Sequence, residues 1–125
     1  STFGGNPFAC RAALTVAREI ERRQLLQNVR ERGDQLRAGL ETLLQSYPGV
    51  FQEVRGWGLL LGLVLRDDCD LTAPQLAAAA INQQLLVVAA GPKVLRLVPP
   101  LVISSREVRQ LLMRLEATCR TTLPI

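Results

Sequence analysis

Arg96 is the residue whose surroundings most strongly suggest binding chemistry. It lies in the segment 91–105, which reads GPKVLRLVPPLVISS. The alternation over 94–98 predicts a β-strand that sets Arg96 between valines on one face, with leucines on the other. A guanidinium is costly to bury alone, so it needs a carboxylate or phosphate partner or an exit to solvent. Because Pro99 and Pro100 end the pairing of the strand, this stretch predicts a holder for a small anionic ligand. Pairing with an internal Asp or Glu, or a position on an edge strand, is the structural alternative.

The segment 1–7, STFGGNP, is a second candidate anion site. Asn6 is suited to cap a helix, and Pro7 suits the first helical position. Ser1 and Thr2 add hydroxyl groups ahead of two glycines. Hydroxyls, backbone N–H groups and a helix N-terminus together favour a phosphate. An ordinary glycine turn before a capped helix explains the same residues without a ligand.

Apolar residues at spacings of three and four predict two consecutive helices that must position these segments. The first runs from Pro7 to about Arg23, with a kink expected near Gln24. The second ends at Pro48-Gly49 and carries an apolar stripe with one glycine. That glycine suggests a close helix approach, and simple tolerance of a glycine is the alternative. This stripe comprises Leu25, Val29, Gly33, Leu36, Leu40 and Leu43.

The remainder predicts strands and two more helices. We expect one strand region at 50–65, with a bulge or close backbone approach at Gly56 and Gly58, and a short strand at 85–89. Helices over 72–85 and from Ser104 each open with a capping box, Thr72 with Gln75 and Ser104 with Glu107. This order predicts an α+β fold: helices packed on one face of a small, mostly antiparallel sheet, preceded by a long N-terminal helix.

Composition narrows the classes of partner. The net charge is +4, but the arginines of the first helices alternate with acidic residues and only 4% of residues are aromatic, so nucleic-acid binding is not expected. With no histidine and widely spaced Cys10, Cys69 and Cys119, we expect no metal site and reduced thiols in a cytoplasmic protein. The three aspartates of the loop 66–70 lack the further ligands of a cation site. No apolar run approaches the ~20 residues of a membrane span.

Three segments together resemble the class III pyridoxal-phosphate aminotransferases. They are STFGGNPFACRAAL at 1–14, VRGWGLLLGLVL at 54–65 and GPKVLRLVPPLVIS at 91–104. They occur in the order of the family and extend over nearly the whole chain. The resemblance implies the C-terminal part of a fold-type I subunit. Residues 1–24 would end the large cofactor domain and form a connecting helix, and residues 25–125 would form the small domain of a homodimeric enzyme.

The same resemblance implies roles for the residues singled out above. Thr2, with Ser1 beside it, would contact the phosphate of pyridoxal 5'-phosphate bound across the dimer interface. Arg96 would bind a carboxylate of the amino-acid substrate. The Schiff-base lysine of the family lies upstream of the STFGG motif, and Lys93, the one lysine of this sequence, matches a variable position that we interpret as surface. We therefore expect no catalytic residue in this chain and no activity from the chain alone.

The implied reaction transfers the amino group of N-acetylornithine to 2-oxoglutarate in arginine biosynthesis. Ornithine, succinylornithine and 4-aminobutyrate are alternative amino donors, because the residues that distinguish them lie mostly outside this chain. A non-catalytic binding or dimerisation module is the alternative from a different class, and the absence of the cofactor lysine is consistent with it.

Overall fold

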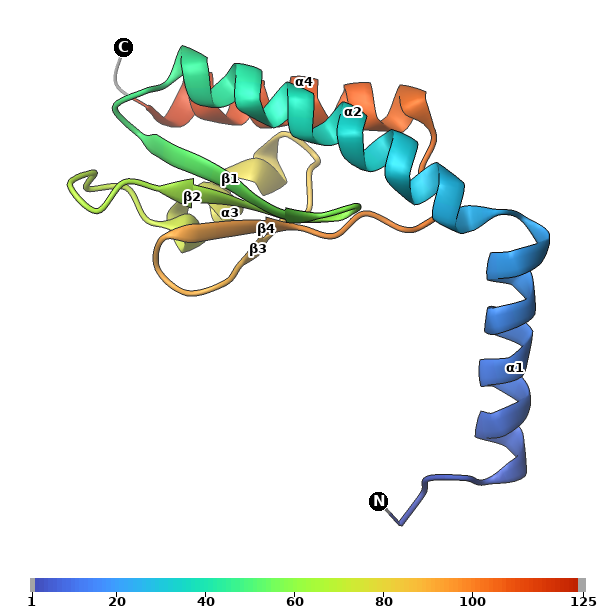
Figure 1. Cartoon of the computed structure of the whole chain (residues 1–125). Coiled ribbons are helices and arrows are strands. Elements are labelled where there is room, and N and C mark those ends of the chain that lie inside the picture. The colour runs from blue at the N-terminus through green and yellow to red at the C-terminus, as the bar shows by residue number, and fades with distance from the viewer. Residues whose placement is uncertain (1, 124–125) are drawn as a thin grey trace.

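The first two helices begin and end close to where their sequence signals place them. In the computed structural model, which describes residues 2–123, α1 spans Pro7–Arg22 and α2 spans Leu25–Ser46. The Asn6 side chain caps α1 by accepting a hydrogen bond from the backbone N–H of Ala9 at 2.9 Å. The kink expected near Gln24 is a complete break, since Gln24 adopts a left-handed conformation with φ of 50°. Figure 1 shows α1 projecting away from the rest of the chain.

The sheet has four strands in the order β1-β2-β4-β3, and every neighbouring pair is antiparallel. The single strand region expected at 50–65 is a hairpin, because a two-residue turn at Gly58-Leu59 reverses the chain. Gly58 has φ of +53°, a conformation that glycine adopts without the steric cost of a Cβ. The strands are β1 (Phe51–Trp57), β2 (Leu60–Leu65), β3 (Val88–Ala89) and β4 (Val94–Leu97).

Of the two alternatives expected at the hairpin glycines, a bulge or a close backbone approach, the structure shows the second. The irregularity in register lies between Phe51 and Glu53, not at either glycine. Close backbone approach is confirmed at both. Gly56 has φ of +114°, and a Cβ there would overlap the carbonyl oxygen of Leu60. A Cβ on Gly58 would lie 2.7 Å from Val29 Cγ1.

Three helices cover one face of the sheet: α2, α3 (Ala73–Asn82) and α4 (Ser105–Thr122) (Figure 1). Leu95 and Leu97 of β4 point into this layer and are buried, whereas Arg96 between them is exposed on the other face. The expected α+β architecture is therefore confirmed. The largest fully buried side chains belong to strands and helices alike: Phe51, Leu36, Leu40, Leu61, Leu63, Leu65, Leu76, Leu95, Leu97, Leu115, Val108 and Thr118.

Both expected capping boxes form. The Thr72 side chain accepts from the N–H of Gln75 at the start of α3, and the Ser104 side chain accepts from the N–H of Glu107 at the start of α4. The Ser104 hydroxyl and backbone N–H both donate to the Glu107 carboxylate, at 2.7 and 2.8 Å. These hydrogen bonds lower the pKa of the Glu107 carboxyl group, because they stabilise its charged form.

Gly33 on the apolar stripe of α2 meets the hairpin turn, not another helix as expected. A Cβ built on Gly33 would lie 2.6 Å from the carbonyl oxygen of Gly58. One turn further along α2, the Arg37 guanidinium donates to the carbonyl oxygens of Val54 and Gly56 on β1. Helix α2 therefore holds the hairpin at two points, by a close approach to its turn and by two hydrogen bonds to β1.

The Gly33 contact predicts an unusual effect of alanine in a helix. Gly33→Ala raises intrinsic helix propensity, but the new methyl group collides with backbone, so we expect a net loss of about 1–3 kcal/mol in the free energy of unfolding. The control is Gly49→Ala, since a Cβ at Gly49 meets no atom within 4 Å. Urea denaturation followed by circular dichroism compares the two variants, and equal midpoints would contradict the contact.

Candidate functional site

Arg96 is presented to solvent from an interior strand. It lies in β4, between β2 and β3, so the edge-strand alternative is wrong. Within residues 2–123 its side chain has no hydrogen-bond or ion-pair partner, so the internal-carboxylate alternative is wrong as well. The charge is tolerated because the side chain leaves the sheet on the face that the helices do not cover. An exposed, unpaired guanidinium at a fixed point on a sheet is suited to bind a carboxylate or phosphate.

Helix α2 also holds the irregular segment that follows Arg96. The Asn28 side-chain amide donates to the carbonyl oxygens of Leu101 and Ile103, at 2.8 and 3.0 Å. Further along the helix, the Gln35 side chain donates to the carbonyl oxygen of Ser105 at 3.1 Å. Sequence reasoning missed these anchors, because their partners lie about 70 or more positions away along the chain. They fix the path of the chain from the end of β4 into α4.

The N-terminal turn is the second site expected from sequence. Ser1 lies outside the described residues. Thr2 is exposed in the turn ahead of α1, and the Asn6 amide ties this turn by donating to the carbonyl oxygen of Phe3 at 2.7 Å. Gly5 has φ of +78° and open space around it. An exposed hydroxyl on a glycine turn at the N-terminus of a helix is a local arrangement of the kind that can bind an anion.

Lys93 is not the surface residue that its place in a turn predicts. It is half-buried, and its ammonium group donates to the carbonyl oxygens of Cys69 and Leu71. These bonds tie the loop 66–71 to the turn before β4. These hydrogen bonds give the Lys93 side chain a structural role, because its ammonium group is already bonded to the backbone. A position in a turn predicts an exposed lysine, but here the neighbouring loop supplies two carbonyl acceptors that draw the side chain in.

The two candidate sites lie apart. Figure 1 places the N-terminal turn at the outer end of α1, away from β4. The fold therefore fixes β4 and the segment that follows it next to α2, but it does not bring Thr2 to Arg96.

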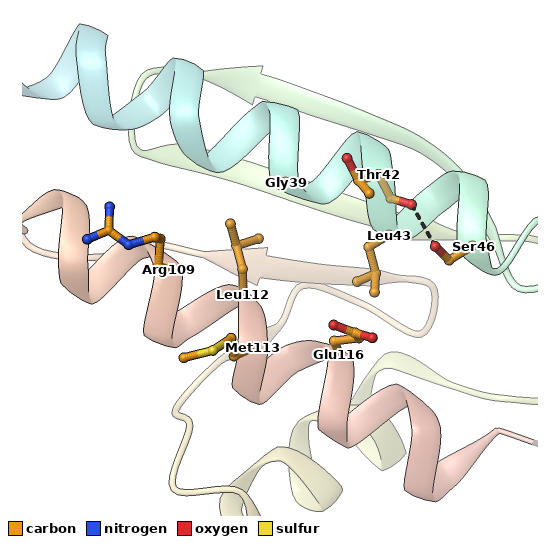
Figure 2. Close-up of a pocket in the computed structure, with 8 residues that line it drawn as sticks. All are labelled: Gly39, Thr42, Leu43, Ser46, Arg109, Leu112, Met113 and Glu116. Atoms are coloured by element: carbon orange, nitrogen blue, oxygen red, sulfur yellow. Dashed lines mark hydrogen bonds between the residues drawn. The ribbon is translucent and has the colours of Figure 1, made fainter.

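A groove of about 390 Å³ lies between α2 and α4 (Figure 2). It is on the helical side of the domain, whereas Arg96 is on the opposite face of the sheet. Its polar groups are already bonded: the Ser46 hydroxyl donates to the carbonyl oxygen of Thr42, Arg109 to the Ser105 hydroxyl, and Glu116 accepts from Arg120. The groove therefore offers little that would select a polar ligand.

The cysteines of the described part of the chain have no metal-binding arrangement. Residues 2–123 contain no group of three or more cysteine, aspartate or glutamate side chains placed to hold a metal ion. Cys10 is exposed, and Cys119 is buried at the end of the apolar face of α4. Burial raises the pKa of the Cys119 thiol to about 12, with a smaller contribution from Glu116. Cys119 is therefore a core residue.

The structure also contains, within residues 2–123, no helix long and apolar enough to cross a membrane.

The motifs and the fold both suggest a relationship to one enzyme family, and a family match supports it. Residues 1–119 match the family "Aminotransferase class-III". The chain belongs to this family.

Individual relatives agree with this assignment. The acetylornithine aminotransferase of Parasynechococcus marenigrum is 70% identical over 94% of the chain, and that of Nostoc sp. is 53% identical over 97%. The solved acetylornithine aminotransferase of Stenotrophomonas maltophilia is 40% identical over 94% of the chain, with a TM-score of 0.85. The chain spans only 28% of the length of the first two relatives and 32% of the third.

The Asn28 anchors predict a local effect of removing one amide. We expect Asn28→Ala to lower the free energy of unfolding by about 1–3 kcal/mol, because two backbone carbonyl groups lose their donor. The backbone N–H of Ile103, which donates to the carbonyl oxygen of Pro100, should then exchange its hydrogen faster. Gln27→Ala is the matched control, since the Gln27 side chain bonds to the exposed Glu31 on its own helix. Equal exchange at Ile103 in both variants would show that Asn28 does not hold this segment.

Proposed function

We propose that this chain is the C-terminal part of an aminotransferase that moves the amino group of N-acetylornithine to 2-oxoglutarate, as in arginine biosynthesis. The observation that carries the proposal is the 70% identity to an acetylornithine aminotransferase over 94% of the chain. The chain spans 28% of that relative, so the remaining machinery would belong to the rest of a longer protein.

The proposed division into domains rests on the break between the first helices. Residues 1–24 would end the large cofactor domain and connect it to the small domain of residues 25–125. The left-handed conformation at Gln24 separates α1 from α2, and α1 has no buried residue of its own. A helix with both polar and apolar sides exposed is typical of an element that packs against another unit.

Two segments of the chain would bind the reactants. Arg96 would hold a carboxylate of the amino-acid substrate or of 2-oxoglutarate through its planar array of donors. Thr2 and Ser1 would bind the phosphate of pyridoxal phosphate held by the partner subunit of a homodimer. This assignment is consistent with the N-terminal turn lying at the outer end of α1, away from the sheet (Figure 1). When bound, pyridoxal phosphate supplies the electron sink for amino transfer.

The chain alone would not carry out this reaction. The cofactor needs a lysine amine, and Lys93 donates to two backbone carbonyl groups of the loop 66–71 instead. We therefore propose that the cofactor lysine lies in the preceding part of the longer protein.

Ornithine is the second candidate amino donor. An ornithine delta-aminotransferase of Plasmodium falciparum covers 97% of the chain with a TM-score of 0.88, at 25% identity. The same fold therefore occurs in enzymes named for either donor. Succinylornithine and 4-aminobutyrate are two further candidate donors, and a non-catalytic binding module is the candidate from a different class.

The test compares the longer protein with this chain in the presence of pyridoxal phosphate and 2-oxoglutarate. We expect the longer protein to form glutamate most efficiently with N-acetylornithine, and the 125-residue chain to form none. A preference for ornithine would overturn the donor assignment and keep the reaction. No glutamate from the longer protein with any of these donors would leave the binding module as the explanation.

Arg96 gives a sharper prediction within the same assay. In the longer protein we expect Arg96→Gln to lower kcat/KM by about 30-fold or more, because a lost charge-assisted contact in a binding site costs about 2 kcal/mol or more. Arg106→Gln removes an exposed arginine from the helical side of the domain and should leave kcat/KM unchanged. Equal activity of the two variants would contradict the assignment of Arg96.

Exposed apolar side chains predict the behaviour of the isolated chain. Phe3, Phe8 and Trp57 are 84–90% exposed, on the N-terminal turn, α1 and the hairpin. We expect the chain to self-associate at about 50 µM, since a longer protein would cover these surfaces. Sedimentation velocity measures this, with Phe8→Ser and Trp57→Ser expected to restore monomer. A clean monomer for the unaltered chain would contradict the prediction.

A further inference from the structure

The groove between α2 and α4 has no part in the proposed function, because it lies on the side of the domain opposite Arg96. Its floor is apolar: Leu43 of α2 is buried, Leu112 of α4 is half-buried, and Met113 is 61% exposed (Figure 2). A methionine side chain is flexible and adapts to many apolar surfaces. The groove is therefore suited to contact with the apolar surface of a protein.

The α2 side of the groove can be buried without leaving a polar group unsatisfied. The hydroxyl groups of Thr42 and Ser46 donate to the carbonyl oxygens of Ala38 and Thr42, both at 3.0 Å. Gly39 has no side chain, and the end of the Leu112 side chain occupies the space that its Cβ would need. A surface with satisfied polar groups loses little when water leaves it.

Two opposite charges stand at the two ends of this groove. Figure 2 shows Arg109 at one end and Glu116 at the other, with the apolar floor between them. Seven residues of helix separate them by about 10 Å on one face. Within residues 2–123 Arg109 has no carboxylate partner, and its guanidinium donates to the Ser105 hydroxyl at 2.8 Å. Glu116 pairs with Arg120 at 2.7 Å, but both side chains are at least half exposed, so this pair contributes little.

This pattern is complementary to itself. Positions 109 and 116 are placed symmetrically about the point between Leu112 and Met113. If a second copy packs its α4 antiparallel across a two-fold axis at that point, Arg109 of each copy faces Glu116 of the other. The methionines of the two copies then meet near the axis. An apolar centre with charged groups at its rim is the usual anatomy of a protein interface.

The size of the surface sets the strength of the contact. Helix α4 has 18 residues. At 1.5 Å per residue it is about 27 Å long, and two helices side by side are roughly 20 Å wide. The face therefore buries roughly 500 Å² per copy, about 1,000 Å² in total, which is at the low end for specific interfaces. We expect weak association that is populated only at high concentration.

We propose that the groove between α2 and α4 is a two-fold interface for a second copy of this chain, with paired contacts between Arg109 and Glu116. The proposal goes beyond the proposed function. In the longer protein this contact joins copies in addition to the homodimer proposed above, since it lies on the helical side and leaves Arg96 free.

The test is a charge swap in a chain that also carries Phe8→Ser and Trp57→Ser, so that α1 and the hairpin do not associate. Sedimentation equilibrium should show a reversible dimer at about 0.1–1 mM. Arg109→Glu sets carboxylates against carboxylates, and Glu116→Arg sets guanidinium groups against each other. Each change alone should lower the association constant about tenfold or more. An equimolar mixture of the two variants should recover it, because every contact between unlike copies again joins opposite charges.

The mixture also shows that both variants fold, since a misfolded chain would not recover association. Arg11→Glu reverses an exposed charge on α1 and is the control, with no change expected. The proposal is overturned if the starting chain stays monomeric up to about 1 mM, if all variants associate equally, or if the mixture fails to recover what the single variants lose. None of these results depends on amino transfer, so this proposal and the proposed function can fail separately.

Discussion

One-sided burial of a small antiparallel sheet is the constraint on which the rest of the structure depends. Helices α2, α3 and α4 cover one face, so alternate strand residues must be apolar, and the others are free to carry charge or ligands. Arg96 is exposed for this reason, although Leu95 and Leu97 beside it are fully buried. The candidate binding face is thus the necessary counterpart of the core.

Helix α2 converts this layered arrangement into a fixed geometry. Gly33 allows the helix to touch the hairpin turn, Arg37 bonds the carbonyl groups of β1, and Asn28 bonds those of the segment after β4. These contacts lie on one helix and reach β1, the hairpin turn and the segment that follows β4. A charged side chain binds a ligand selectively only when its backbone is held in this way.

Helix α1 projects from the packed part of the chain (Figure 1). Its residues are unburied within this chain, and its N-terminal turn carries Thr2 far from the sheet (Figure 1). An amphipathic helix whose apolar side stays exposed offers a surface against which another unit can pack. An exposed apolar surface on α1 is consistent with the length comparison, since the chain spans only 28% of the length of a relative from its family. The same chain thus presents Arg96 on the uncovered sheet face and Thr2 on a separate turn, both exposed.

The sequence by itself determined the elements that depend on local signals. Capping residues, proline and the apolar stripe placed α1, α2 and α4, and the motifs indicated the family, because these signals act over a few residues. Only the tertiary structure decided the hairpin at Gly58, the partner of Gly33, the hydrogen bonds of Lys93 and the exposure of Arg96 on an interior strand. Each depends on strand register or on contacts between distant segments, and a local pattern contains no information about which distant segment will supply the partner.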